Sequence, residues 1–222
     1  MFAPPRIRSL CRAGCLVAMT MLLAACGVGK SGEAPTQLDL GTTSAIPSGQ
    51  TVLANPPVVV PQASSSALLS QTMVIWRVGN EGQPRAYATY QWVAPPAKLL
   101  RQRVIDRLSQ QGAVLQQGVG ADMPTIRLDV QRFEQTFSAD GDRSEGHVTV
   151  QAVMVKGSQY MDRLLIDVKA PAPTQDAEGG AVALRQAADQ AAEQLARWVT
   201  ATLSAPSQSA LNRPSKPSLS SR

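Results

Sequence analysis

The chain has few of the residues from which covalent cross-links and catalytic sites are commonly built. Its 222 residues include three cysteines, one histidine, and three each of Phe, Trp and Tyr. Two cysteines, Cys11 and Cys15, lie in a segment that we expect to be removed, which leaves Cys26 alone and excludes an intramolecular disulfide. A His-based triad or metal site is confined to the surroundings of His147, which we expect to be an exposed residue at the start of a strand.

Long apolar runs are also missing. The longest one near the N-terminus, Ala13 to Leu23, has about 11 residues, well short of the ~20 that a membrane-spanning helix needs. It follows three arginines, and the first 25 residues contain no acid. This order of basic, apolar and small residues predicts that residues 1–25 are an export signal peptide. Removing them leaves 18 of the 21 basic residues against 16 acidic ones, a balance that does not favour nucleic acid as a partner.

The end of the leader, Leu23-Ala24-Ala25-Cys26, resembles a bacterial lipobox. In that interpretation the chain is cleaved between Ala25 and Cys26, and the Cys26 thiol carries acyl chains, palmitate among them, that anchor the new N-terminus. Gly27 replaces the Asp that retains lipoproteins at the inner membrane, so the expected location is the periplasmic face of the outer membrane. The alternative is an ordinary cleaved signal followed by an incidental cysteine.

Composition divides the rest of the chain into three parts. Residues 26–35 are small and polar, which predicts a flexible tether between the lipid and the fold. Residues 36–203 carry all the periodic patterns and are expected to form one domain. Residues 204–222 are rich in Ser, Pro and basic residues without periodicity, which predicts a disordered tail.

Within the domain, alternating runs predict strands over residues 73–78 and 86–92, joined by a turn at Gly79–Gly82, and over residues 125–133, 148–154 and 160–168. Apolar spacing predicts helices over about 98–111 and 181–203, with Gly179 and Gly180 loosening the start of the second. The predicted fold class is α+β: an antiparallel sheet, made of a hairpin plus a three-stranded meander, packed by two main helices.

The two helices differ in their patterns. The later one has an apolar stripe of Leu184, Ala188, Ala191, Leu195 and Trp198, which predicts docking on the sheet. The earlier one carries charges on its other face, namely Lys98, Arg101, Arg103, Asp106 and Arg107. We interpret that face as solvated, with contact to phospholipid headgroups as the alternative.

The stretch from Tyr87 to Leu100 is the most distinctive part of the chain. Tyr87, Tyr90 and Trp92 precede the Pro95-Pro96 step, which ends a strand and suits the first turn of a helix. These aromatics alternate irregularly, so two interpretations stay open. They pack in the core and the sheet, or some of them form, with the two prolines, a surface for a partner or a lipid.

Motifs for enzymatic chemistry are absent from the sequence. There is no Gly-x-Ser-x-Gly elbow, the Asp140-Gly141-Asp142 triplet lacks the rest of a calcium loop, and Gly118 and Gly120 have no third glycine. We therefore expect a non-enzymatic protein without metal or cofactor.

One family combines these features. The segments Met73-Val-Ile-Trp-Arg77 and Tyr87-x-x-Tyr90-x-Trp92-Val-Ala-Pro95-Pro96, the lipobox and the alanine-rich last helix resemble the ABC-type transport auxiliary lipoproteins, over roughly residues 36–203. This is the family of the lipoprotein encoded with paraquat-inducible MCE transport systems. The Ser/Pro-rich segment before Met73 and the C-terminal tail depart from its pattern.

The resemblance implies a lipid-anchored outer-membrane component of a system that moves phospholipid or other hydrophobic compounds. Its partners would be a periplasmic MCE-domain protein, with a permease and an ATPase in the inner membrane, and a homo-oligomer is compatible with this role. A different hypothesis is a structural lipoprotein that assists an outer-membrane assembly machine. An envelope hydrolase centred on His147 is the enzymatic alternative.

Overall fold

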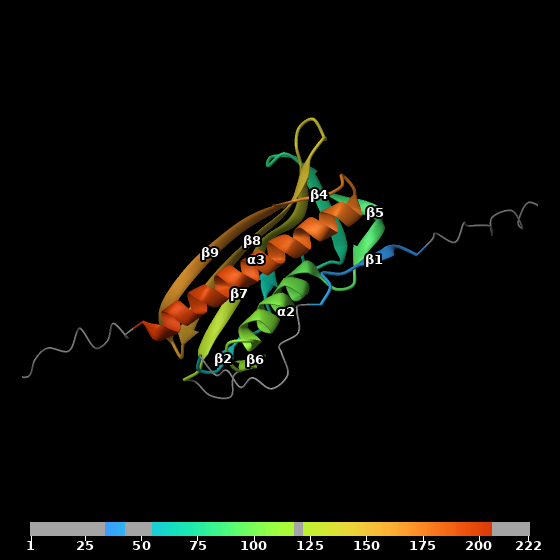
Figure 1. The fold of residues 1–222 in the computed structure, drawn as a ribbon. Helices are drawn as coiled ribbons and strands as arrows, with labels where there is room; N and C mark the ends of the chain where they lie inside the picture. The colour runs from blue at the N-terminus through green and yellow to red at the C-terminus, as the bar shows by residue number, and fades with distance from the viewer. Residues whose placement is uncertain (1–33, 43–54, 118–121, 206–222) are drawn as a thin grey trace, which may run out of the picture. The chain divides into compact units, whose positions relative to one another are not determined.

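The computed structural model of the chain describes residues 34–42, 55–117 and 122–205, and from Pro35 onward these belong to one compact unit (Figure 1). The predicted signal peptide, Cys26, and almost all of the predicted tether and tail lie outside the described residues. The predicted domain of residues 36–203 can therefore be compared with the structure over most of its length.

Three long strands make up the largest part of the sheet: β7 (Pro124–Phe137), β8 (Ser144–Lys156) and β9 (Gln159–Pro171). They pair antiparallel in chain order, with a bulge in β7 between Val130 and Arg132. Gly141 and Gly157 adopt positive φ in the two connecting turns, a conformation that costs glycine little. The strands are longer than predicted because their ends carry polar residues, which the alternation of apolar residues does not mark.

The remaining strands extend this sheet in a mixed arrangement. Strand β4 (Met73–Val78) pairs antiparallel with β5 (Arg85–Trp92), but parallel with β7, and β1 (Thr36–Leu38) runs parallel to β5. Three short strands, β2 (Val58–Val59), β3 (Ser64–Ser65) and β6 (Val114–Leu115), add further parallel pairs. The α+β class is confirmed. The sheet is mixed and largely antiparallel, not wholly antiparallel as predicted, because strands distant in sequence join it in parallel pairs.

Two helices lie side by side on one face of the sheet (Figure 1). The first, α2 (Pro96–Ser109), begins at the second proline of the Pro95-Pro96 corner, which suits the first helical turn as predicted. The second, α3 (Ala177–Ser204), starts four residues earlier than predicted, because the Asp176 carboxylate accepts a hydrogen bond from the Gly179 amide at 2.7 Å and caps the helix. The glycine pair therefore belongs to the helix, which corrects the prediction of a loosened start.

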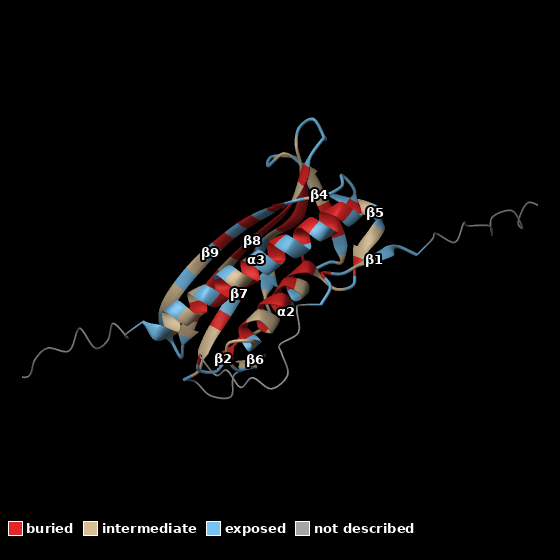
Figure 2. Cartoon of the chain, viewed as in Figure 1, coloured by how far each residue is buried: buried red, intermediate tan, exposed pale blue. Residues whose placement is uncertain are grey.

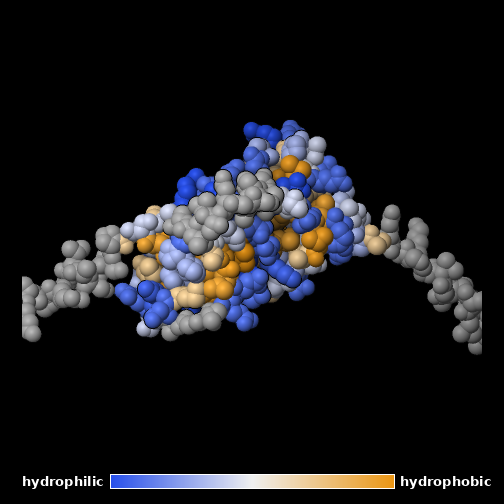
Figure 3. Space-filling view, turned by 60° about the horizontal axis from the view of Figure 1, so that its bottom comes forward, coloured by the Kyte–Doolittle hydropathy of each residue, from blue (hydrophilic) through white to orange (hydrophobic). Residues whose placement is uncertain are grey.

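The core lies between the helices and the sheet, and buried segments alternate with exposed ones along both helices (Figure 2). The predicted stripe of α3 is confirmed, with Leu184, Ala188, Ala191 and Leu195 each at most 1% exposed. Trp198 is half-buried, and its indole N–H donates to the Asp162 carboxylate at 2.7 Å. Apolar residues also reach the surface in separate areas with hydrophilic residues between them (Figure 3).

The predicted solvated face of α2 is wrong for two of its arginines, since Arg101 and Arg103 are each 4% exposed. Arg101 donates to the Val60 and Pro61 carbonyls at 2.6 and 2.7 Å, and Arg103 donates to the Gly41 carbonyl at 3.1 Å. These arginines bind the segments around β1 and β2 to the helix, so they are not available to phospholipid headgroups.

The same face of α2 also pairs with α3. Arg103 lies 3.2 Å from Asp189, and Arg107 pairs with Glu193. Burial raises the pKa of Asp189, which the charges of Arg103 and Arg185 oppose. The charges of the first helix thus join the two helices.

Candidate functional site

The five residues of the predicted partner or lipid surface fall into two groups in the structure, one buried in the core and one partly exposed. Trp92 is 1% exposed and packs edge-on against Phe133, with ring centroids 5.6 Å apart, and Pro96 is buried in the first turn of α2. Both belong to the core. Tyr87, Tyr90 and Pro95 are half-buried, so part of each faces solvent.

Two of these residues belong to an aromatic cluster, formed by Trp76, Tyr87, Tyr90 and Phe137. Ring centroids are 6.1 Å apart for Trp76 and Tyr87, 5.7 Å for Trp76 and Phe137, and 6.1 Å for Tyr87 and Tyr90. The four rings come from β4, β5 and β7, and the parallel β4–β7 pair brings them together. The sequence did not reveal the cluster as a unit, because no pattern along the chain predicts that pairing.

The cluster borders a hollow of about 320 Å³ with a largely apolar lining, formed by Trp76, Val78, Tyr87, Phe137, Gly141 and Gln175. Val78 is 44% exposed there. The guanidinium of Arg85 lies 5.4 Å from the Trp76 ring centroid, a cation–π contact. The hollow is thus a small apolar depression.

Hydrogen bonds hold the Tyr87 ring in place. Its hydroxyl donates to Gln135 Oε1 at 2.8 Å, and Gln135 Nε2 donates to Ser144 Oγ at 2.8 Å. Burial, the Asp176 charge and Tyr90 raise the pKa of Tyr87 to about 12, so its hydroxyl stays protonated at neutral pH. Gly180 of α3 packs so closely that a Cβ there would lie 2.2 Å from Gln135 Oε1.

The opposite, helix-free face of the sheet carries an ion-pair network of Arg77, Glu134, Arg132, His147 and Asp167, in which Glu134 and His147 are buried and Asp167 is exposed. Arg77 contacts both Glu134 oxygens at 2.6 and 2.8 Å, and Arg132 lies 3.3 Å from the same carboxylate. Arg132 also approaches His147 Nδ1 at 3.0 Å, while His147 Nε2 lies 2.6 Å from Asp167 Oδ1. The network therefore crosses four neighbouring strands.

His147 is 4% exposed, which corrects the expectation of an exposed residue at a strand end. Because a guanidinium only donates, Nδ1 must accept from Arg132, and the ring proton on Nε2 is donated to Asp167. Hydrogen bonds from Thr149 and then from His147 lower the pKa of Asp167. Both ring nitrogens are thus engaged, and in this arrangement the only histidine is not free to take a proton from a hydroxyl nucleophile.

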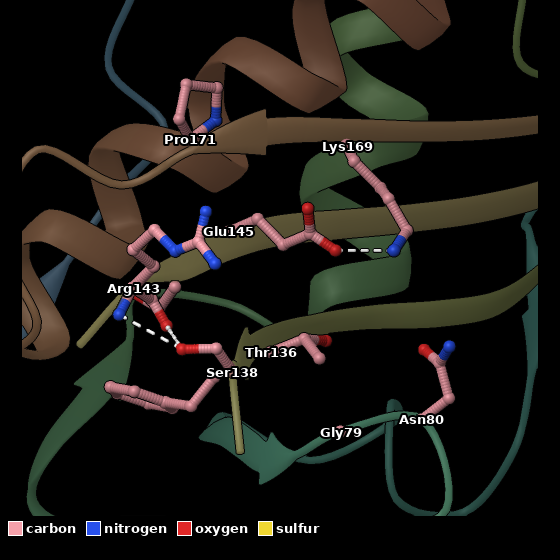
Figure 4. Close-up of a pocket in the computed structure, with 10 residues that line it drawn as sticks. Gly79, Asn80, Thr136, Ser138, Arg143, Glu145, Lys169 and Pro171 are labelled. Atoms are coloured by element: carbon pink, nitrogen blue, oxygen red, sulfur yellow. Dashed lines mark hydrogen bonds and ion pairs between the residues drawn. The ribbon is translucent and has the colours of Figure 1, made fainter. Parts of the chain in front are cut away.

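Beside this network lies a cleft of about 520 Å³, whose lining includes the polar residues Asn80, Thr136, Ser138, Arg143, Glu145 and Lys169 together with Phe137 and Pro171 (Figure 4). It lies at the end of the sheet where the β4–β5 and β7–β8 turns and the last residues of β9 meet. Sequence reasoning did not find this cleft, because its residues come from separate segments without a shared motif.

The described residues contain neither a metal site nor a membrane-spanning helix. Within the described ranges, no group of three or more His, Cys, Asp or Glu side chains is placed to hold a metal ion. Neither described helix combines the length and the apolar character needed to cross a bilayer. The predicted lipidation at Cys26 lies outside the described residues.

The chain matches the model of one protein family and resembles the folds of two crystal structures. The model of the family described as ABC-type transport auxiliary lipoprotein component matches residues 38–196. A crystal structure of a DUF330 family protein from Xanthomonas campestris has a TM-score of 0.61 at 19% identity, covering 77% of this chain and 95% of that one. A crystal structure of an uncharacterized protein has a TM-score of 0.60 at 18% identity, covering 75% and 99%. No curated protein matches the chain.

Proposed function

Because the chain belongs to the family of ABC-type transport auxiliary lipoprotein components, we propose that it is the outer-membrane lipoprotein of an MCE-type transport system. The observation that carries this proposal is the match over residues 38–196, which spans nearly the whole domain behind a leader that ends in a lipobox. The role is non-enzymatic: phospholipid or another hydrophobic compound moves, and an inner-membrane ATPase supplies the energy.

The anchor in this proposal is Cys26. Each buried methylene of an acyl chain contributes about 0.8 kcal/mol to membrane binding, so two or more chains hold the protein on the membrane permanently. Residues 27–35 then give the domain its reach, and the domain engages a periplasmic MCE-domain protein. A permease and the ATPase complete the system at the inner membrane.

The aromatic cluster is our proposed docking surface for the MCE-domain partner. Tyrosine and tryptophan provide large contact areas at low cost in side-chain entropy and are enriched at protein interfaces. Here their rings are fixed by mutual packing and by the Tyr87 hydrogen bond, and Val78 adds exposed apolar surface. A partner would therefore meet a preorganised apolar depression.

Site-specific photo-crosslinking in intact cells tests this surface. A photoreactive amino acid replaces Val78 or Tyr90 in the cluster, and Tyr160 in a control variant. Tyr160 is 57% exposed and lies at the start of β9, about 40 Å along the strand direction from the cluster end of the sheet. We expect the MCE-domain protein to be captured from the two cluster positions and not from Tyr160.

Two results would count against the proposal. Equal capture of the MCE-domain protein from all three positions would refute the aromatic cluster as the docking surface, but it would not contradict the transport role. Capture of a β-barrel assembly protein in place of the MCE-domain protein would instead support the structural role in outer-membrane assembly.

A further inference from the structure

Strand β9 forms a long edge of the sheet. Among the described residues it pairs with β8 and with no other strand, and it runs along the outer side of the sheet (Figure 1). With 13 residues it is longer than most strands, whereas sheet edges are commonly kept short or covered. Its outer side is therefore open to a further strand from another chain.

The backbone of β9 directs alternate residues toward β8 and away from it. The Ala172 amide donates to the Ser144 carbonyl at 2.9 Å, and these two residues continue the strand register. Hydrogen-bonded and non-bonded pairs alternate in an antiparallel ladder, so the even-numbered residues from Leu164 to Ala170 bond β8. The odd-numbered residues from Arg163 to Lys169 therefore point their N–H and C=O groups outward. Pro171 belongs to this outward set, where its missing N–H removes no bond to β8.

Three side chains of the outward set lie in a row on the helix-free face. Leu165 is 61% exposed, more than any other large hydrophobic residue of the described chain. Arg163 binds Asp162 through its backbone amide, while its guanidinium forms no hydrogen bond or ion pair within the described ranges. Asp167 accepts from Thr149 and His147 through Oδ1 alone, which leaves Oδ2 without a hydrogen bond from any described residue. The row thus presents a free cation, an apolar side chain and a free carboxylate oxygen.

We propose that the chain forms a two-fold dimer in which β9 pairs antiparallel with β9 of a second copy, centred on Leu165. In this register each Leu165 lies opposite its counterpart, and each Arg163 lies opposite Asp167 of the other copy. The opposite charges meet twice, as a self-complementary interface requires. A centre at Leu164 would place Arg163 opposite Leu165, and a centre at Ile166 would place it opposite Lys169, a repulsive pair.

The backbone favours the same register. The two Leu165 residues point outward, so they can exchange hydrogen bonds with each other, and each Asp167 amide can donate to the Arg163 carbonyl of the other copy. Neither bond uses the Arg163 amide, which already donates to Asp162 at 2.8 Å. The pairing would join two sheets into one and cover the exposed Leu165 side chains. It depends on β9 alone and not on the proposed MCE partner.

Cross-linking of the full chain in isolated membranes tests the dimer. Leu165→Cys places a thiol at the two-fold axis, where the Cα atoms are about 5.5 Å apart, so a short bis-maleimide should give a covalent dimer. Tyr160→Cys is the control, because Tyr160 is 57% exposed on the same strand. It lies five residues from Leu165 in each copy, so the two thiols would be roughly 34 Å apart and should not be joined. The wild-type chain gives the background from Cys26.

Charge reversal tests the register. In the Leu165→Cys background, Arg163→Glu places a carboxylate opposite Asp167 twice, and it should lower the initial rate of cross-linking about tenfold or more. Arg127→Glu is the matched control, because Arg127 is exposed and aligns with Val153 of β8 as Arg163 does, but lies two strands inside the edge. It should leave the rate unchanged.

Four results would overturn the dimer. They are the absence of a covalent dimer from Leu165→Cys, equal yields from Leu165→Cys and Tyr160→Cys, a cross-linking rate unaffected by Arg163→Glu, and cross-linking of Leu165→Cys to a different protein alone. The last of these would assign the β9 edge to another partner.

Discussion

The buried arginines of α2 lead to a prediction about stability. We expect Arg101→Met to lower the free energy of unfolding by about 3 kcal/mol, because Arg101 donates two short, charge-assisted hydrogen bonds to the Val60 and Pro61 carbonyls and each is worth ~1.5–3 kcal/mol. Methionine keeps the packing of the aliphatic stem, so the loss reports on the guanidinium and not on an empty volume.

Urea denaturation followed by tryptophan fluorescence measures the difference, since Trp92 lies in the core against Phe133. Lys98→Gln is the control, because Lys98 is an exposed residue of the same helix, and its replacement should change stability by less than ~0.5 kcal/mol. Arg101→Lys should fall between the two, since an ammonium lacks the forked geometry that reaches both carbonyls. If Arg101→Met and Lys98→Gln had equal, small effects, the side chain would be solvated and our account of α2 would fail.

Two further predictions concern the helix contact and the ion-pair network. Gly180→Ala should lower the melting temperature, because the new Cβ would lie 2.2 Å from the wholly buried Gln135 side chain. This effect opposes the usual preference of a helix for alanine over glycine, which is about 1 kcal/mol. A higher melting temperature would contradict the packing of α3. Hydrogen bonds from Thr149 and His147 lower the pKa of Asp167 in the folded protein. The Asp167 carboxylate therefore stabilises the fold fully above its unfolded-state pKa of about 4. This contribution is lost as the pH falls through the lowered folded-state pKa. Asp167→Asn should therefore reduce stability at pH 7 and flatten its decline in acid, as measured by denaturation at a series of pH values; an unchanged acid slope would argue against the network.

Local structure could be predicted from the sequence where the pattern and the turn chemistry agree. The bounds of β4, Met73–Val78, are those expected from its β-branched composition and the glycine-rich turn that follows. The Pro95-Pro96 corner likewise places the start of α2, because proline restricts the residues on both sides of the break. The parallel pairing of β4 with β7 could not be predicted, since alternation along a strand does not identify its neighbour.

The polar residues were harder to place for a related reason. Arg101 and Arg103 have the spacing of a solvated helix face, and the carbonyls that bury them belong to backbone segments whose positions no side-chain pattern marks. His147 is buried because Arg132 and Asp167 face it from the two flanking strands. Arg132 and Asp167 both align with Thr149, two residues along β8 from His147, so they reach His147 diagonally, and this requires the register of all three strands to be known.

Fractionation of the Cys26→Ala protein tests the central claim most directly. The wild-type chain should sediment with the outer membrane in a density gradient, because the proposed acyl chains on Cys26 would hold it there. Cys26→Ala should leave that fraction, since the domain would lose its only proposed anchor. If Cys26→Ala still sedimented with the outer membrane, or if the wild-type chain were found in the inner membrane, the account of a lipid-anchored outer-membrane component would be contradicted.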